Sequence, residues 1–69
     1  MKKIEFSDRE KDVLRLKIAG FADKAIAQKL KIQFGTVRKY LDRAKLKCNC
    51  RTNLQLALHL KSKKRLLAR

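Results

Sequence analysis

Charged side chains recur at helical spacing between residues 34 and 47, and their chemistry is ionic and hydrogen-bonding. Guanidinium and ammonium groups bind phosphates, and an arginine can also donate two hydrogen bonds to a guanine edge. A helix that presents such a face over about two turns fits the width and charge of a DNA major groove. The residues of this face are Arg38, Lys39, Asp42, Arg43 and Lys45.

An apolar stripe lies behind this charged face, and a shorter apolar helix precedes it. Val37, Leu41 and Ala44 recur at helical spacing, so they are expected to pack inward. The order of a short helix, a tight turn and a second helix is typical of a helix-turn-helix unit. The apolar positions of the first helix and the turn are Ile26, Ala27, Leu30 and Ile32.

Helical patterns cover nearly the whole chain, which predicts an all-α, four-helix (tetrahelical) fold in a single domain over residues 1–69. The absence of proline and the presence of two glycines favour helices joined by short turns. A basic tail over residues 61–69 is expected to extend the last helix. The expected helices span about residues 7–19, 23–30, 34–47 and 53–62.

Start and stop signals support these boundaries. Ser7 with Glu10, and Thr52 with Gln55, have the spacing of a capping box at the start of the first and fourth helices. Gly20 tolerates the left-handed conformation that ends a helix. The first helix is therefore predicted to stop before the helix-turn-helix unit begins.

The charge is unevenly distributed along the chain. The four basic and four acidic side chains of residues 1–12 cancel, so the formal net charge of +14 lies in residues 13–69. Only Asp23 and Asp42 oppose sixteen Lys and Arg there. Such an excess destabilises the folded state through self-repulsion, which an anionic partner relieves. Nucleic acid is the expected partner, and an anionic membrane surface is the second choice.

The residue types that carry catalysis or bind metals are few. Cys48, Cys50 and His59 lack the usual spacing of a zinc site, so no metal and no cofactor are expected. The thiols are expected to be reduced, with Cys48 packing as a small apolar residue at the end of the third helix. No serine, cysteine or carboxylate has a suitable base beside it. These features predict a binding protein and not an enzyme.

The leucines of the predicted fourth helix point to more than one side of it, so a single small core cannot cover them all. One stripe is expected to pack on the first helix, and the remainder is expected to form a homodimer surface. The expected dimer residues are Leu54, Ala57, Leu58 and Lys61.

Three segments follow a family pattern without a gap between residues 6 and 58. Residues 6–16, Phe-Ser-Asp-Arg-Glu-Lys-Asp-Val-Leu-Arg-Leu, follow Leu-Thr-x-Arg-Glu-x-Glu-Val-Leu. Residues 20–27, Gly-Phe-Ala-Asp-Lys-Ala-Ile-Ala, follow Gly-Leu-Ser-Asn-Lys-Glu-Ile-Ala. Residues 30–41, Leu-Lys-Ile-Gln-Phe-Gly-Thr-Val-Arg-Lys-Tyr-Leu, follow Leu-x-Ile-Ser-x-x-Thr-Val-Lys-x-His-Leu. Together the segments resemble the LuxR/GerE-type helix-turn-helix domain.

The resemblance implies a stand-alone bacterial transcription regulator, cytoplasmic and associated with the nucleoid, that binds double-stranded DNA as a homodimer. Its third helix would enter the major groove, and its fourth helix would form the dimer. The implied DNA contacts are Lys24 and Thr36 to phosphates, Arg38, Lys39 and Asp42 to base edges, and Arg43 and Lys45 to bases or backbone.

Three positions of this predicted DNA-binding surface depart from the family pattern. Gln33 replaces the usual serine, so the third helix has a weaker cap. Gly35 lets the backbone approach a phosphate closely but lowers helix propensity. Asp42 is acidic within a basic face, where it can accept a hydrogen bond from cytosine N4 or orient Arg38 or Arg43.

Three other interpretations stay open. Residues 35–44 also resemble the last helix of sigma-factor region four, a module that acts mainly through RNA polymerase or another regulatory protein. Alternating leucine and basic residues toward the C-terminus fit a membrane-active peptide, but the two capping signals and the lack of any membrane-length apolar run favour a folded domain off the membrane. Structured RNA is a further ligand class, but no aromatic stacking platform is visible.

Overall fold

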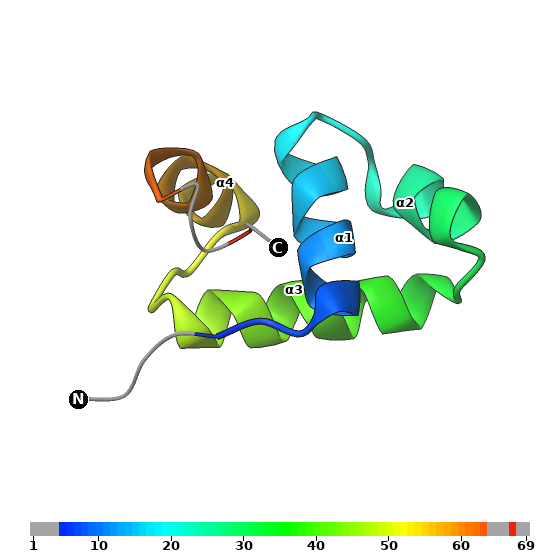
Figure 1. Cartoon of the computed structure of the whole chain (residues 1–69), viewed down its shortest axis with the longest axis horizontal. Helices are drawn as coiled ribbons and strands as arrows, with labels where there is room; N and C mark the ends of the chain where they lie inside the picture. The colour runs from blue at the N-terminus through cyan, green and yellow to red at the C-terminus, as the bar shows by residue number, and fades with distance from the viewer. Residues whose placement is uncertain (1–4, 64–66, 68–69) are drawn as a thin grey trace.

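The computed structural model describes residues 5–63 and 67, and within them the chain forms four helices and no strand. The longest helix, α3, runs along one side of the molecule, with α1 against its middle, α2 over its N-terminal part and α4 near its C-terminal end (Figure 1). The all-α, four-helix fold expected from the sequence is confirmed. The helices are α1 (Asp8–Ile18), α2 (Asp23–Leu30), α3 (Phe34–Lys47) and α4 (Asn53–Ser62).

The first helix begins and ends where its signals indicate. The Ser7 hydroxyl accepts a hydrogen bond from the Glu10 amide at 3.2 Å, and the Ser7 amide donates to Glu10 Oε1 at 3.0 Å. These two bonds form the predicted capping box and satisfy two first-turn donors. Gly20 follows the helix with a φ of 103°, a conformation that costs glycine little.

The start of α4 differs from the prediction in one bond. The Thr52 hydroxyl accepts from the Gln55 amide at 3.1 Å, as expected of a cap. The Gln55 side chain, however, accepts from the amide of Arg51 at 2.7 Å and not from that of Thr52. The expected capping box is therefore half formed, because the Gln55 side chain accepts from the amide one residue before the cap.

The turn inside the helix-turn-helix unit depends on a non-glycine residue in the left-handed region. Lys31, which ends α2, has a φ of 56°. The next amide, that of Ile32, donates to the carbonyl of Ala27 at 3.0 Å and closes the last turn of the helix. Asn49 adopts a similar φ of 55° after α3, and asparagine tolerates this left-handed conformation better than most residues.

All four helices contribute to one hydrophobic core. Phe6 lies in it ahead of α1, and Cys48 closes it at the end of α3, as predicted for this cysteine. Partly buried side chains, among them Leu30 and Ile32, pack around its margin. The buried apolar residues are Phe6, Val13, Leu14, Ile26, Ala27, Val37, Leu41, Ala44, Cys48, Leu56, Leu60 and Leu67.

The tail differs from the expected helical extension. The helix α4 ends at Ser62, and Leu67 is buried in the core. The guanidinium of Arg15 donates a hydrogen bond to the Leu67 carbonyl, which joins this residue to α1. The remainder of the predicted tail, residues 64–66 and 68–69, lies outside the described residues.

Candidate nucleic-acid interface

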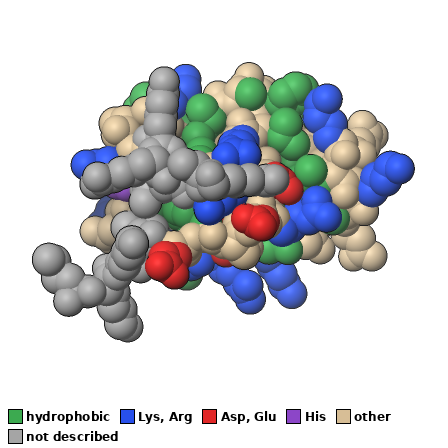
Figure 2. Space-filling view, viewed as in Figure 1, with side chains coloured by type: hydrophobic (Ala, Val, Ile, Leu, Met, Phe, Trp, Pro, Cys, Tyr) green, Lys and Arg blue, Asp and Glu red, His purple; other side chains and the backbone are tan. Residues whose placement is uncertain are grey.

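The helix α3 has one side in the core and the opposite side in solvent. Val37, Leu41 and Ala44 are completely or almost completely buried, as their spacing predicts. Arg38, Lys39, Asp42 and Arg43 are exposed. The helix packs on α1 and α2, so its exposed side faces away from the body of the domain. The space-filling view shows Lys and Arg side chains along the lower edge, where α3 runs in Figure 1 (Figure 2).

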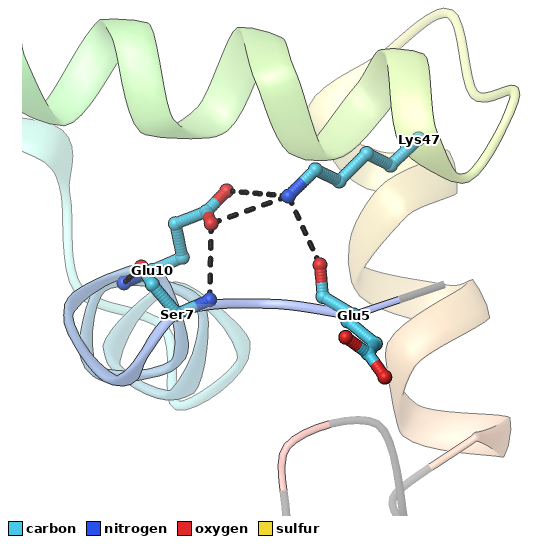
Figure 3. A network of polar contacts seen from close by, with 4 residues as sticks. All are labelled: Glu5, Ser7, Glu10 and Lys47. Atoms are coloured by element: carbon cyan, nitrogen blue, oxygen red, sulfur yellow. Dashed lines mark hydrogen bonds and ion pairs between the residues drawn. The ribbon is translucent and has the colours of Figure 1, made fainter. Parts of the chain in front are cut away.

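A polar network holds the C-terminal end of α3 (Figure 3). The Lys47 ammonium lies 3.2 and 3.3 Å from the two carboxylate oxygens of Glu10 and donates to the Glu5 carbonyl at 3.0 Å. It also lies 5.1 Å from the centroid of the Phe6 ring. One lysine therefore joins the end of α3 to α1 and to the segment that precedes α1.

Glu10 is the buried carboxylate of this network, only 6% exposed. Burial by itself raises the pKa of a carboxyl group, but the hydrogen bond from the Ser7 amide and the ion pair with Lys47 outweigh it. The pKa of Glu10 is consequently lowered from its ordinary value. The charged form is thus a part of the folded structure, and it fixes α3 relative to α1.

The N-terminal ends of α2 and α3 have no side-chain cap. Ala22 precedes α2 and Gln33 precedes α3, and neither side chain accepts a hydrogen bond from the first turn. Gln33 is exposed, as is Gly35 in the first turn of α3. A Cβ atom placed on Gly35 would meet no atom within 4 Å, so packing inside the domain does not require glycine there.

The acidic residue of the exposed face has a partner within α3. Asp42 Oδ1 lies 3.3 Å from the Lys45 ammonium, one turn away. The sequence suggested Arg38 or Arg43 as the residue that Asp42 orients, and the structure places Lys45 there instead. Exposed pairs of this kind contribute less than about 1 kcal/mol, so a base or phosphate can compete for either group.

The remaining predicted DNA contacts lie on two adjoining helices. Lys24 is exposed at the second residue of α2, and Thr36 is half-buried in the first turn of α3. Both residues lie in the first turn of their helix, and α2 packs on α3. We call this set the α3 surface: Lys24, Gln33, Gly35, Thr36, Arg38, Lys39, Asp42, Arg43 and Lys45.

The helix α4 divides its leucines between two sides. Leu56 and Leu60 are buried, whereas Leu54 is 70% and Leu58 58% exposed. Ala57 is half-buried and Lys61 is exposed near the two outer leucines in the helical order. The predicted dimer residues therefore lie on the side of α4 that the core does not cover.

Two exposed apolar residues were missed by the sequence analysis. Phe34, the first residue of α3, is 48% exposed, and Leu46 near its end is 82% exposed. The Arg38 guanidinium lies over the Phe34 ring at 5.9 Å from its centroid. The four-residue spacing of an aromatic and an arginine on one helix was the available signal for this contact. Nothing in the structure explains the exposure of Leu46.

The family assignment rests on a match over most of the chain. Residues 5–60 match the family model described as bacterial regulatory proteins, luxR family. The chain belongs to the LuxR family. The domain of this family has a helix-turn-helix fold, in agreement with α2 and α3. The family is one of DNA-binding regulators and not of enzymes. No curated protein and no solved structure matches the chain significantly.

The described residues contain neither a group of metal ligands nor a membrane-spanning helix. Among residues 5–63 and 67, no three His, Cys, Asp or Glu side chains are grouped so that they could hold a metal ion. Cys48 is buried and Cys50 is half-buried, and both are free thiols. Burial raises the pKa of Cys48, which keeps its thiol protonated. None of the helices in this described part is sufficiently long and apolar to span a membrane.

Proposed function

We propose that this LuxR-family protein is a sequence-specific regulator of transcription that inserts α3 into the major groove of double-stranded DNA. The observation that carries the proposal is the exposed side of α3, where Arg38, Lys39 and Arg43 project from a helix whose other side is fixed in the core. A helix of this width fits the major groove, and its cations complement the phosphates that border it.

The α3 surface divides into residues that bind all DNA and residues that distinguish sequences. Lys24 and Thr36, in the first turns of α2 and α3, are proposed to bind phosphates, and Gln33 and Gly35 lie close to Thr36 in the sequence. Arg38, Lys39 and Asp42 face base edges, and Arg43 and Lys45 reach bases or backbone. Phosphate contacts supply most of the affinity and carry no direct sequence information, whereas base contacts supply the preference.

The outer side of α4 is the proposed homodimer surface. Leu54 and Leu58 are mostly in water in the isolated chain, and a second copy of α4 would bury them with Ala57 and Lys61. The net charge of +14 opposes association of two free chains. DNA neutralises part of that charge, so we expect the dimer to form more readily on DNA than in solution.

A selection of bound sequences from random duplex DNA tests the proposal. We expect an inverted repeat whose half-sites lie about 10 base pairs apart, one helical turn. We also expect the affinity to fall steeply with salt, because several phosphate contacts release counterions. Such a protein acts on the bacterial chromosome, which places it in the cytoplasm with the nucleoid.

Two alanine variants separate the roles within the α3 surface. Arg38→Ala should lose about 1–3 kcal/mol of discrimination between the selected and a random duplex. Lys24→Ala should weaken binding to both duplexes alike and reduce the salt dependence. Lys63→Ala, which removes one exposed charge after α4, is the matched control and should change little. Equal losses of affinity for Arg38→Ala on both duplexes would contradict its role in base recognition.

A pull-down tests the sigma-factor alternative. If the protein retains RNA polymerase without any DNA, that alternative is favoured.

A further inference from the structure

Phe34 is an apolar residue at the N-terminal end of the α3 surface, and it is not part of the hydrophobic core. It is the first residue of α3, and it adjoins the exposed residues Gln33 and Gly35. Nearly half of its surface is in water, at 48% exposure. An aromatic ring gains stability by leaving water, and folding of this chain realises only about half of that gain at Phe34.

The ring of Phe34 is also the support of Arg38. The two residues are four apart on one helix, so they lie on the same side of it, and the guanidinium lies 5.9 Å from the ring centroid. A guanidinium over an aromatic face is attracted by the ring and loses part of its freedom. Arg38 is thereby held in a preferred direction while both groups stay open to solvent.

We propose that Phe34 and Arg38 act as one recognition unit, in which the Phe34 ring contacts the C5 methyl group of a thymine and positions Arg38 for a nearby guanine. This inference rests on the proposed function. The thymine methyl is an apolar group displayed in the major groove, and a phenylalanine ring can contact it. The cations around Phe34 favour this occupant over an apolar protein surface, because they attract the phosphates on either side of the groove.

The helix geometry limits the distance between the two bases. Residues four apart are separated by about 6 Å along a helix axis. Successive base pairs are separated by about 3.4 Å, so the thymine should lie within about two base pairs of the guanine. The inference therefore predicts a short motif in each half-site that contains both bases.

Deoxyuridine substitution tests the methyl contact, because it removes only the C5 methyl of thymine. In the duplex selected by the unaltered protein, each thymine is replaced in turn and the dissociation constant is measured by fluorescence anisotropy. We expect a loss of about 3- to 5-fold at one thymine per half-site, the effect of one buried methyl group. Phe34→Ala should bind more weakly and should no longer distinguish deoxyuridine from thymine at that position.

A second variant separates the contact from the positioning of Arg38. Phe34→Leu keeps an apolar side chain but removes the ring, so it should retain part of the response to deoxyuridine while its preference for the guanine falls. Leu46→Ala, at the other end of α3, is the control and should keep both responses. Circular dichroism melting verifies that each variant is folded.

The selection and the deoxyuridine substitutions can each overturn the proposed contact of Phe34 with thymine. A selected site without thymine near the guanine, or no response to any deoxyuridine, overturns the inference and leaves the proposed function intact. An unchanged deoxyuridine response in Phe34→Ala also overturns it. No enrichment of any duplex sequence would refute the proposed function itself, and this inference with it.

Discussion

The two pairs of helices in this domain are built by different rules. The scaffold pair, α1 and α4, begins with side-chain caps from Ser7 and Thr52. The helix-turn-helix pair, α2 and α3, begins with no such cap and carries exposed cations. A cap contributes about 1 kcal/mol to stability, so the domain has its local stability concentrated away from the α3 surface. The helix-turn-helix pair is therefore held by packing and by two ion pairs, Lys47 with Glu10 at α3 and Lys17 with Asp23 at α2, and neither helix has a side-chain cap.

Removing Glu10 should produce the largest change, because it disconnects the scaffold from α3. Glu10→Ala leaves the Ser7 amide without its acceptor and the Lys47 ammonium without its carboxylate. The expected decrease in the free energy of unfolding is about 1–3 kcal/mol, measured by urea denaturation. Glu10→Gln keeps the shape of the side chain and should lose less. Equal stability of Glu10→Ala and the unaltered protein would show that the network does not hold α3.

Acidic pH should reproduce part of the stability loss of Glu10→Ala, because it protonates the Glu10 carboxylate. Because folding lowers the pKa of Glu10, its carboxylate stabilises the protein fully above the ordinary pKa of glutamate. That contribution is lost as the pH falls through the lowered value of the folded state. Glu10→Gln should therefore lose less stability between neutral and acidic pH than the unaltered protein. A variant that loses just as much would assign the acid sensitivity to other groups.

Both helices of the helix-turn-helix pair can be given the side-chain caps that they lack. Ala22→Ser and Gln33→Ser each place a hydroxyl where it can accept from the first turn, and each should raise stability by about 0.5–1 kcal/mol in thermal melts. Only Gln33→Ser removes a proposed DNA-contacting side chain, so only this variant should weaken DNA binding, by a few-fold. Equal affinities for the two variants would show that Gln33 makes no useful contact.

Gly35→Ala should raise stability and weaken DNA binding. The new methyl group meets nothing within 4 Å in the domain, and alanine favours the helix by up to about 1 kcal/mol. The same methyl group would keep a phosphate from close approach to the first turn of α3, so affinity should fall on every duplex sequence. A variant that is more stable and binds equally well would remove Gly35 from the α3 surface.

Local signals in the sequence were sufficient to predict most of the fold. The apolar positions Val37, Leu41 and Ala44 predict which side of α3 is buried, because helical spacing relates residues a turn apart. The capping residues predict where α1 and α4 begin, and Gly20 predicts where α1 ends, because each acts on its immediate neighbours in the chain. The observed bounds of α2, α3 and α4 coincide with the expected ranges, and α1 is one residue shorter at each end.

Contacts between distant parts of the chain were not predictable in this way. Lys47 and Glu10 are 37 residues apart, and no periodicity relates them. Burial of Leu67 also depends on the final arrangement of helices, since its neighbours in sequence form a basic tail. Within α3, the pairing of Asp42 with Lys45 and the contact of Arg38 with Phe34 depend on side-chain rotamers. The side of α3 that is exposed was predictable from helical spacing, but the orientation of its side chains was not.

We propose that α3 binds in the major groove, and probing of the selected duplex with dimethyl sulfate shows whether it does. This reagent methylates guanine N7 in the major groove and adenine N3 in the minor groove. The protein should protect guanine N7 within each half-site, and Arg38→Ala should abolish protection of one guanine. Protection confined to adenine N3, with every guanine N7 still reactive, would contradict the claim.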